Sequence, residues 1–261
     1  MNPPQGETNH SAVRLRAHFA PVGFEVDRVV VPAVALHADV VILLTQSATD
    51  IARSTLRRVT RRLEAHGVRH AVQTCDLWDP ASVVNEVGAV TSSAPQHEYF
   101  FNVSTGAKTA CIGGTMASMF WRVRPYYQPV VYVDGPPPAR ESPLDGPPRL
   151  IPTLETPALD RRTADTLTFL VDRASPISKR ELMSHMRAVE TIYPREKPQV
   201  SPQALHAQAD TILHRLVSWG FAEIHGRRRG MRISATETGR GGARMFRHVL
   251  EPRSPPTVLR V

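Results

Sequence analysis

The chain has 261 residues, of which 41% are hydrophobic and 21% charged, a composition typical of a globular protein with one large domain or two smaller ones. Its apolar runs are shorter than the roughly 18 residues that a transmembrane helix needs, and residues 1–10 are too polar for a secretory signal. The two cysteines, Cys75 and Cys111, exclude a disulfide framework, and no His/Cys cluster has metal-ligand spacing. We therefore expect a protein of the reducing cytoplasm with no metal centre and no membrane partner.

The net charge of +8 is unevenly distributed along the chain. Residues 1–150 contain 14 Lys and Arg against 13 Asp and Glu, whereas residues 151–261 contain 18 against 11. A basic half beside a nearly neutral half indicates that the second half binds a polyanion and that the first half does something else.

Strand-like and helix-like segments alternate in the first half. Strands are expected at 13–20, 39–45, 69–77, 98–103 and 130–133, and helices at 25–37, 50–66, 80–90 and 108–122. This alternation predicts right-handed crossovers and a mostly parallel sheet, so residues 11–134 are expected to form a Rossmann-like α/β domain. The ligand crevice of such a domain lies beyond the carboxyl ends of its strands.

The second half follows a Pro/Gly-rich stretch at 135–150, which predicts a semi-rigid linker. From there to residue 250 the expected order is three helices at 161–173, 179–187 and 202–219, two short strands at 221–225 and 231–234, and a closing helix at 236–250. Three helices followed by a hairpin is the order of a winged helix-turn-helix domain, assigned to 151–250. Residues 1–10 and 251–261 are predicted to be flexible tails.

Duplex DNA is the polyanion that a winged helix-turn-helix domain predicts. Its third helix enters the major groove and its hairpin lies along phosphates or in a minor groove. The candidate DNA-binding residues are three on the third helix and three at the hairpin tip: Ser201, Gln203, Arg215, Arg227, Arg228 and Arg229. Two alternatives stay open: the hairpin arginines form a solvated turn, or the winged helix contacts a protein.

Residues 102–108, Asn-Val-Ser-Thr-Gly-Ala-Lys, lead from the fourth predicted strand into a helix. Free backbone N–H groups and the positive helix end make this turn a candidate anion site, and Lys108 is the only lysine in residues 1–150. The spacing fits neither a Walker A loop nor the GxGxxG dinucleotide fingerprint. A second turn, 20–24, follows the first strand. Together they supply the candidate ligand-binding residues Pro21, Gly23, Phe24, Asn102, Ser104, Thr105, Gly106 and Lys108.

Four segments together resemble the CRISPR-associated Rossmann-fold (CARF) domain: residues 18–28 (HFAPVGFEVDR), Ala38-Asp39, residues 102–108 and Pro125-Tyr-Tyr127. The whole chain is similar to the archaeal CARF proteins that carry a C-terminal winged helix and are described as transcriptional regulators. One departure is Ala107, where many CARF domains have a second Gly or a Thr.

The resemblance implies a homodimer whose strand-end loops meet at the two-fold axis and bind a cyclic oligoadenylate, most often cyclic tetraadenylate. It places phosphate and ribose on Ser104, Thr105, Gly106 and Lys108, with Pro21, Gly23 and Phe24 as the opposite wall. The implied function is a ligand-responsive DNA-binding regulator in CRISPR-Cas systems, with no cofactor and no catalytic residue.

Two enzymatic alternatives stay open. A ring nuclease would cleave the bound ligand by attack of a ribose 2′-hydroxyl, with Ser104 and Lys108 stabilising the developing charge and His18 or His97 near the crevice. The Arg-x4-His pattern of Arg180 and His185 matches the motif of HEPN ribonucleases. HEPN domains are purely helical, whereas this pattern precedes a predicted hairpin, which disfavours the ribonuclease. No general base is evident beside Ser104 and Lys108 for the ring nuclease, so the sequence favours a sensor.

Overall fold

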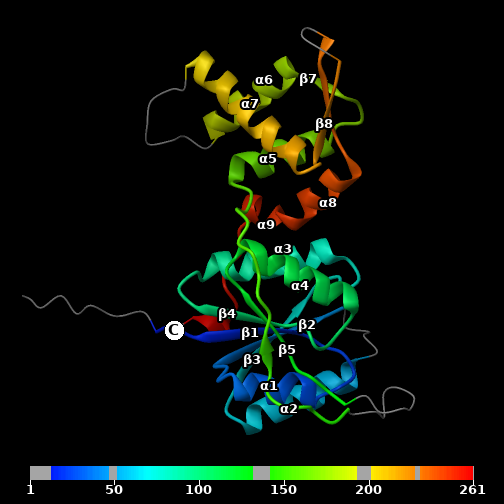
Figure 1. Cartoon of the computed structure of the whole chain (residues 1–261). Coiled ribbons are helices and arrows are strands. Elements are labelled where there is room, and N and C mark those ends of the chain that lie inside the picture. Colours follow the sequence, from blue (N-terminus) through cyan, green and yellow to red (C-terminus); the bar gives the residue numbers. More distant parts are fainter. Residues whose placement is uncertain (1–12, 47–51, 132–141, 193–200, 227–229, 261) are drawn as a thin grey trace, which may run out of the picture.

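The computed structural model describes residues 13–46, 52–131, 142–192, 201–226 and 230–260, which form two lobes (Figure 1). The first lobe contains a six-stranded sheet, and the second contains a three-stranded sheet with helices. None of the helices in these ranges is long and apolar enough to cross a membrane.

The sheet of the first lobe is mostly parallel, as predicted. Its strands are β1 (Arg16–Pro21), β2 (Val40–Thr45), β3 (Arg69–Thr74), β4 (Glu98–Asn102), β5 (Arg124–Tyr127) and β6 (Arg149–Leu150). They lie in the order β3-β2-β1-β4-β5-β6, and all neighbouring pairs are parallel except β5 and β6. β2 is buried along its whole length because helices cover both faces. The first lobe is therefore a Rossmann-like α/β domain.

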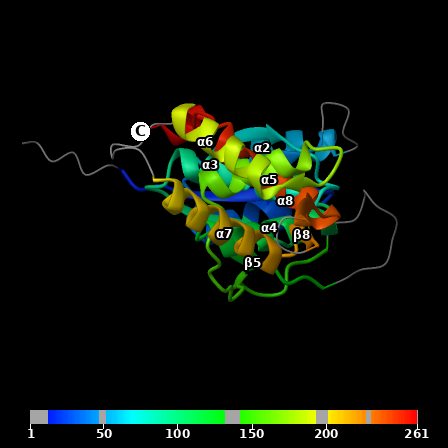
Figure 2. The same ribbon diagram turned by 90° about the horizontal axis from the view of Figure 1, so that it is seen from above.

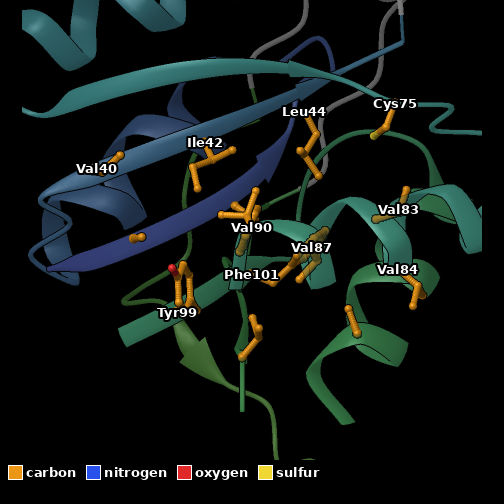
Figure 3. Close-up of a cluster of buried hydrophobic side chains, with 14 of the residues drawn as sticks. Val40, Ile42, Leu44, Cys75, Val83, Val84, Val87, Val90, Tyr99 and Phe101 are labelled. Carbon is orange, nitrogen blue, oxygen red and sulfur yellow. The ribbon is translucent and has the colours of Figure 1, made fainter. Parts of the chain in front are cut away.

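Four helices cover this sheet: α1 (Asp27–Ala35), α2 (Arg53–Ala65), α3 (Pro80–Ser93) and α4 (Lys108–Phe120). α1 and α2 lie on one face and α3 and α4 on the other (Figure 1). Figure 3 shows Val87 of α3 beside Phe101 of β4, in a cluster that also contains Ile42 and Val83. α4 approaches so closely that a Cβ on Gly114 would lie 2.1 Å from the Phe101 ring, so only glycine fits there.

The fifth strand was predicted at 130–133, and this is wrong. β5 lies at Arg124–Tyr127, while Val130 makes an isolated bridge with Leu144 and residues 132–133 lie outside the described ranges. Pro125 lacks the N–H that an interior strand residue normally donates. Its carbonyl still accepts from the Ile151 N–H at 2.8 Å, so this residue keeps one hydrogen bond to the chain that follows β6.

The described part of the predicted linker, residues 142–150, packs against the sheet of the first lobe and is not a free-standing connection between the lobes. The Gln128 side chain donates to the Gly146 carbonyl at 2.9 Å, and β6 extends the sheet as its antiparallel edge. The remaining linker residues, 135–141, lie outside the described ranges.

The second lobe contains α5 (Arg161–Val171), α6 (Lys179–Ile192), α7 (Pro202–Ser218), α8 (Glu237–Met245) and α9 (Arg247–Leu250). The strands β8 (Ala222–His225) and β9 (Arg232–Ala235) form a hairpin, and β7 (Ile177–Ser178) pairs with β9 as a third strand. Ser201 caps α7 by accepting from the Ala204 N–H. At the other end of α7, Gly220 follows the C-cap residue and turns the chain with a φ of 69°. α6 continues past the predicted end at 187.

The two lobes are joined by direct contacts as well as by the chain between them. α8 and α9 lie on α3, where Arg244 pairs with Asp79 at 3.1 Å and Arg253 pairs with Glu86 at 3.0 Å (Figure 1). Beyond α9 the chain returns to the first lobe, where residues 257–259 form a 3₁₀ turn and Leu259 enters the sheet core. This differs from the prediction of a flexible tail after residue 250.

Candidate functional site

The two predicted loops lie against each other at the carboxyl edge of the sheet. β1 and β4 are neighbours, with Phe19 opposite Phe101, so the turns that follow them are adjacent. A Cβ on Gly23 would lie 2.8 Å from the Gly106 backbone nitrogen, and a Cβ on Gly106 would lie 2.5 Å from that of Pro21. Gly106 also has a φ of +83°, which favours glycine. Both glycines are therefore required for this contact.

Exposed groups at this edge suit an anionic ligand. Lys108 is the first residue of α4 and is exposed, as is Gly106. No side chain caps α4 at Ala107, so the N–H groups of its first turn and the positive helix end remain open. Phe24 is 38% exposed on the opposite loop. This arrangement offers a cation, backbone donors and an aromatic ring.

Other predicted ligand residues are buried and hold the loop in place. The Asn102 carboxamide accepts from the Ser104 N–H at 2.8 Å and donates to the Arg28 carbonyl at 2.7 Å. The Ser104 hydroxyl accepts from the Gln128 N–H at 2.5 Å. Thr105 and Pro21 are also buried. Four of the eight predicted ligand residues, Pro21, Asn102, Ser104 and Thr105, are therefore buried and lie beneath the exposed groups of the two loops.

The two histidines considered as bases lie away from the open crevice. The His18 ring is fully buried, stacks on Phe100 with centroids 4.6 Å apart, and has its Nδ1 3.3 Å from the Tyr126 hydroxyl. Burial, helped by the nearby Arg16 charge, lowers the pKa of His18 to about 3, so its ring is neutral at pH 7. His97 precedes β4 at the opposite edge, where its Nε2 lies 3.0 Å from the Leu259 carbonyl.

Arg28 was not among the predicted site residues. It pairs with Glu25 at 3.0 Å, and the other oxygen of Glu25 accepts from the Ser142 hydroxyl at 2.7 Å. Burial raises the pKa of Cys111, and the Arg28 charge opposes that rise. Because the Arg28 and Glu25 side chains are only 14% and 16% exposed, they form a largely buried ion pair beside the 20–24 turn. The only feature of the sequence that pointed to Arg28 is its position as the last residue of the segment 18–28, HFAPVGFEVDR.

In the second lobe, the predicted DNA-binding residues have different surroundings. Ser201 and Gln203 are exposed at the start of α7, and His206 and His214 lie farther along its exposed face. Figure 2 shows α7 uncovered in the view from above. Arg215 instead pairs with Asp160 at 2.9 Å, so its guanidinium is held toward α5. Arg227, Arg228 and Arg229 lie outside the described residues.

The Arg-x4-His pattern has a structural explanation. The His185 Nε2 lies 2.6 Å from a carboxylate oxygen of Asp165, and its ring stacks on Phe169 with centroids 3.8 Å apart and planes 7° apart. Both contacts join α6 to α5. His185 therefore serves the packing of the second lobe, while Arg180 is exposed.

A comparison with known protein families gives a match within the first lobe. Residues 16–130, which include both loops, match the family model described as HFX_2341_N:-like, N-terminal. No curated protein has a matching sequence.

Three solved structures are similar to this chain. They are Can2 from Sulfobacillus thermosulfidooxidans in complex with cyclic tetra-adenylate, protein VC1899 from Vibrio cholerae, and Csm6 from Enterococcus italicus bound to cyclic hexa-2′-fluoro-hexa-dAMP. Their sequence identities are 14%, 11% and 10%, and their TM-scores 0.39, 0.38 and 0.38. The matches cover 88%, 90% and 78% of this chain but 63%, 66% and 46% of the others, so this chain spans less than two thirds of each.

Proposed function

We propose that this protein is a homodimeric, ligand-responsive DNA-binding regulator whose first lobe senses a cyclic oligoadenylate. The observation that carries the proposal is the close contact between Gly23 and Gly106 beside the exposed Lys108. The contact joins the two strand-end loops into one surface, and the open end of α4 supplies anion-binding groups there.

A cyclic oligoadenylate suits this surface chemically. Its phosphates match Lys108 and the backbone N–H groups of α4, and its adenines match the exposed ring of Phe24. The resemblance of residues 18–28 and 102–108 to CARF domains adds the choice of ligand, with cyclic tetraadenylate as the first to test.

Exposed apolar residues support a dimer at the same edge. Trp78, which follows β3, is 70% exposed, and Ile112 in α4 is 54% exposed. The Thr109 hydroxyl donates to the Leu77 carbonyl at 2.7 Å, so these two segments are adjacent. An apolar surface beside the site would be covered by a second copy of the chain, and a two-fold site would then match a symmetric cyclic ligand.

The second lobe supports a DNA-binding role through its order of elements and its charge. α5, α6 and α7 followed by the β8–β9 hairpin is the order of a winged helix-turn-helix, and the exposed face of α7 carries Gln203, His206 and His214. Residues 151–261 carry a net charge of +7, from 18 basic and 11 acidic residues. Duplex DNA is the partner that this charge favours.

Calorimetric titration of the full chain with cyclic tetraadenylate tests the sensor. We expect one ligand per two chains, and at least tenfold weaker binding by Lys108→Ala because a charge-assisted contact is lost. Lys179→Ala is the matched control, since Lys179 lies in α6 and pairs with Asp210. Absence of heat and of a thermal shift at saturating ligand would refute the sensor, as would equal loss in both variants.

A further inference from the structure

A cavity lies at the opposite edge of the sheet from the strand-end loops. Its volume is about 670 Å³, which is within the range of small-molecule sites. Arg14, Glu98 and Arg124, at the amino ends of β1, β4 and β5, form its floor. The ends of α3 and α4 and the segment at 153–155 complete its walls, and Figure 1 shows that segment running from β6 up to α5.

Positive charge gathers on the floor of this cavity. Glu98 lies 3.3 Å from the Arg14 guanidinium, 3.4 Å from that of Arg124 and 3.7 Å from that of Arg16. Three guanidinium groups thus share one carboxylate, and the cluster has a net positive charge. The side chains of Arg14 and Arg124 are 64% and 52% exposed, so their N–H donors are open to a ligand. Arginine forks of this kind match the oxygens of a phosphate.

An aromatic wall stands beside the arginines. Phe120 and Trp121, at the end of α4, line the cavity together with Tyr99. The Trp121 ring is held by Phe120, with centroids 5.4 Å apart, and by His248 at 5.1 Å. A fixed aromatic surface next to a cationic cluster suits a ligand with a flat ring at one end and an anion at the other.

The backbone at Arg122 is a further unusual feature of this cavity. Arg122 has a φ of +50°, a left-handed conformation that residues other than glycine seldom adopt. The turn places the Arg122 side chain beside the cavity, where its Nε lies 3.7 Å from Glu155. Backbone strain of this kind is common beside binding sites.

We propose that this cavity binds a nucleoside phosphate, with its phosphate on Arg14 and Arg124 and its base against Phe120 and Trp121. The proposal is independent of the strand-end site, because no residue is shared between them. The cavity also touches the segment at 153–155 and the aromatic cluster that joins the lobes, so an occupant would contact the junction between them.

Calorimetric titration of the full chain with adenosine 5′-monophosphate tests this inference, with adenosine and inorganic phosphate as separate probes. We expect one nucleotide per chain, bound at least tenfold more tightly than either fragment, with a change in tryptophan fluorescence that Trp121→Phe abolishes. The double variant Arg14→Gln, Arg124→Gln should bind at least tenfold more weakly. Glu98→Gln should have the opposite effect. It removes the carboxylate that competes with the nucleotide's phosphate for Arg14 and Arg124, so it should tighten nucleotide binding several-fold.

Two further variants test whether the nucleotide binds in this cavity rather than elsewhere on the chain. Arg57→Gln changes an exposed arginine of α2, and Lys108→Ala changes the strand-end site; both should bind the nucleotide like the wild type. No nucleotide binding by the wild type overturns the proposal. So does a loss in Arg57→Gln equal to that in the double variant, a loss confined to Lys108→Ala, or binding by Glu98→Gln that is no tighter than wild type.

Discussion

Gly88 of α3 and His248 of α9 fit together so closely that a Cβ on Gly88 would lie 2.5 Å from Cε1 of the histidine ring. The His248 N–H donates to the Asn85 side-chain oxygen at 2.8 Å, and its ring lies edge-on to Trp121. α9 of the second lobe therefore packs directly on α3 of the first lobe. We call this contact the Gly88–His248 seam.

A second contact beside this seam offers a route between the candidate sensor and the second lobe that does not use the Pro-rich chain segment. α4 begins at Lys108 in the strand-end site and ends at Phe120, next to Trp121. Phe120 packs on Phe246 of the second lobe with ring centroids 5.2 Å apart. A ligand that shifts α4 would displace these aromatic contacts, provided that it binds the two arrangements with different affinity.

Gly88→Val tests the seam. The added side chain would overlap the His248 ring, and such overpacking typically costs about 1–3 kcal/mol. We expect a lower Tm and faster proteolysis between the lobes. Gly241→Ala, at a site in α8 with open space around it, is the matched control and should leave both unchanged or slightly raise the Tm. If Gly88→Val and Gly241→Ala had the same Tm and the same rate of proteolysis, the seam would not hold the lobes together.

The stability of the protein should fall in mild acid because of two buried histidines. Burial lowers the pKa of His18 to about 3, and burial, helped by the Arg253 charge, lowers that of His248 to about 4. The unfolded chain, with histidine pKa values near 6.5, then binds more protons than the folded chain below about pH 6.5. The stability that both neutral rings provide is complete above that pH and is lost as the pH falls toward 4 and 3.

Urea unfolding at pH 7.5 and pH 5 measures this effect. Each histidine should contribute about 1–2 kcal/mol to the loss between these values. In His248→Gln the difference between the two pH values should shrink, because one titrating ring is gone. His66→Gln changes an exposed histidine and should keep the wild-type difference. An unchanged difference in His248→Gln would contradict the assignment.

Local signals in the sequence located many of the elements. The helices expected at 80–90 and 202–219 each follow a cap residue and a proline, Asp79-Pro80 and Ser201-Pro202, and both cap side chains accept the capping hydrogen bond. The helix expected at 50–66 stops before Gly67, which has a φ of 69° and suits a helix C-terminus. Such features depend on neighbouring residues, so a sequence read without relatives can identify them.

Contacts between distant residues were beyond the same analysis. Ser104 accepts from the Gln128 N–H, and no local pattern distinguishes such a structural hydroxyl from one that binds a ligand. The return of Leu259 to the sheet core depends on a pocket formed by residues far away in the sequence. The sequence could therefore predict that the two loops are neighbours, and the structure was needed to separate their exposed groups from the buried residues that support them.

Gly106→Ala tests whether the contact between the two loops is necessary for the candidate site. The new Cβ would lie 2.5 Å from that of Pro21, and the φ of +83° adds backbone strain. We expect cyclic tetraadenylate binding to weaken at least tenfold. Gly67→Ala has similar strain at a φ of +69° but no neighbour within 4 Å, so it should lose some stability, roughly 1 kcal/mol, and keep ligand binding. Ligand affinity that is equal in both variants would mean that the loop contact is not part of the site.

Salt dependence of DNA binding tests the role of the second lobe. A polyanion bound through phosphate contacts loses affinity as salt rises, with a log–log slope of about 0.9 per neutralised phosphate. Replacing Arg227, Arg228 and Arg229 with alanine should reduce that slope by about two to three if the hairpin lies along the backbone. Gln203→Ala, in contrast, should leave the slope unchanged and alter the preference among duplex sequences, because Gln203 carries no charge and is exposed at the start of α7. DNA binding that neither change affects would show that the DNA is bound elsewhere on the chain and would contradict the role proposed for α7 and the hairpin.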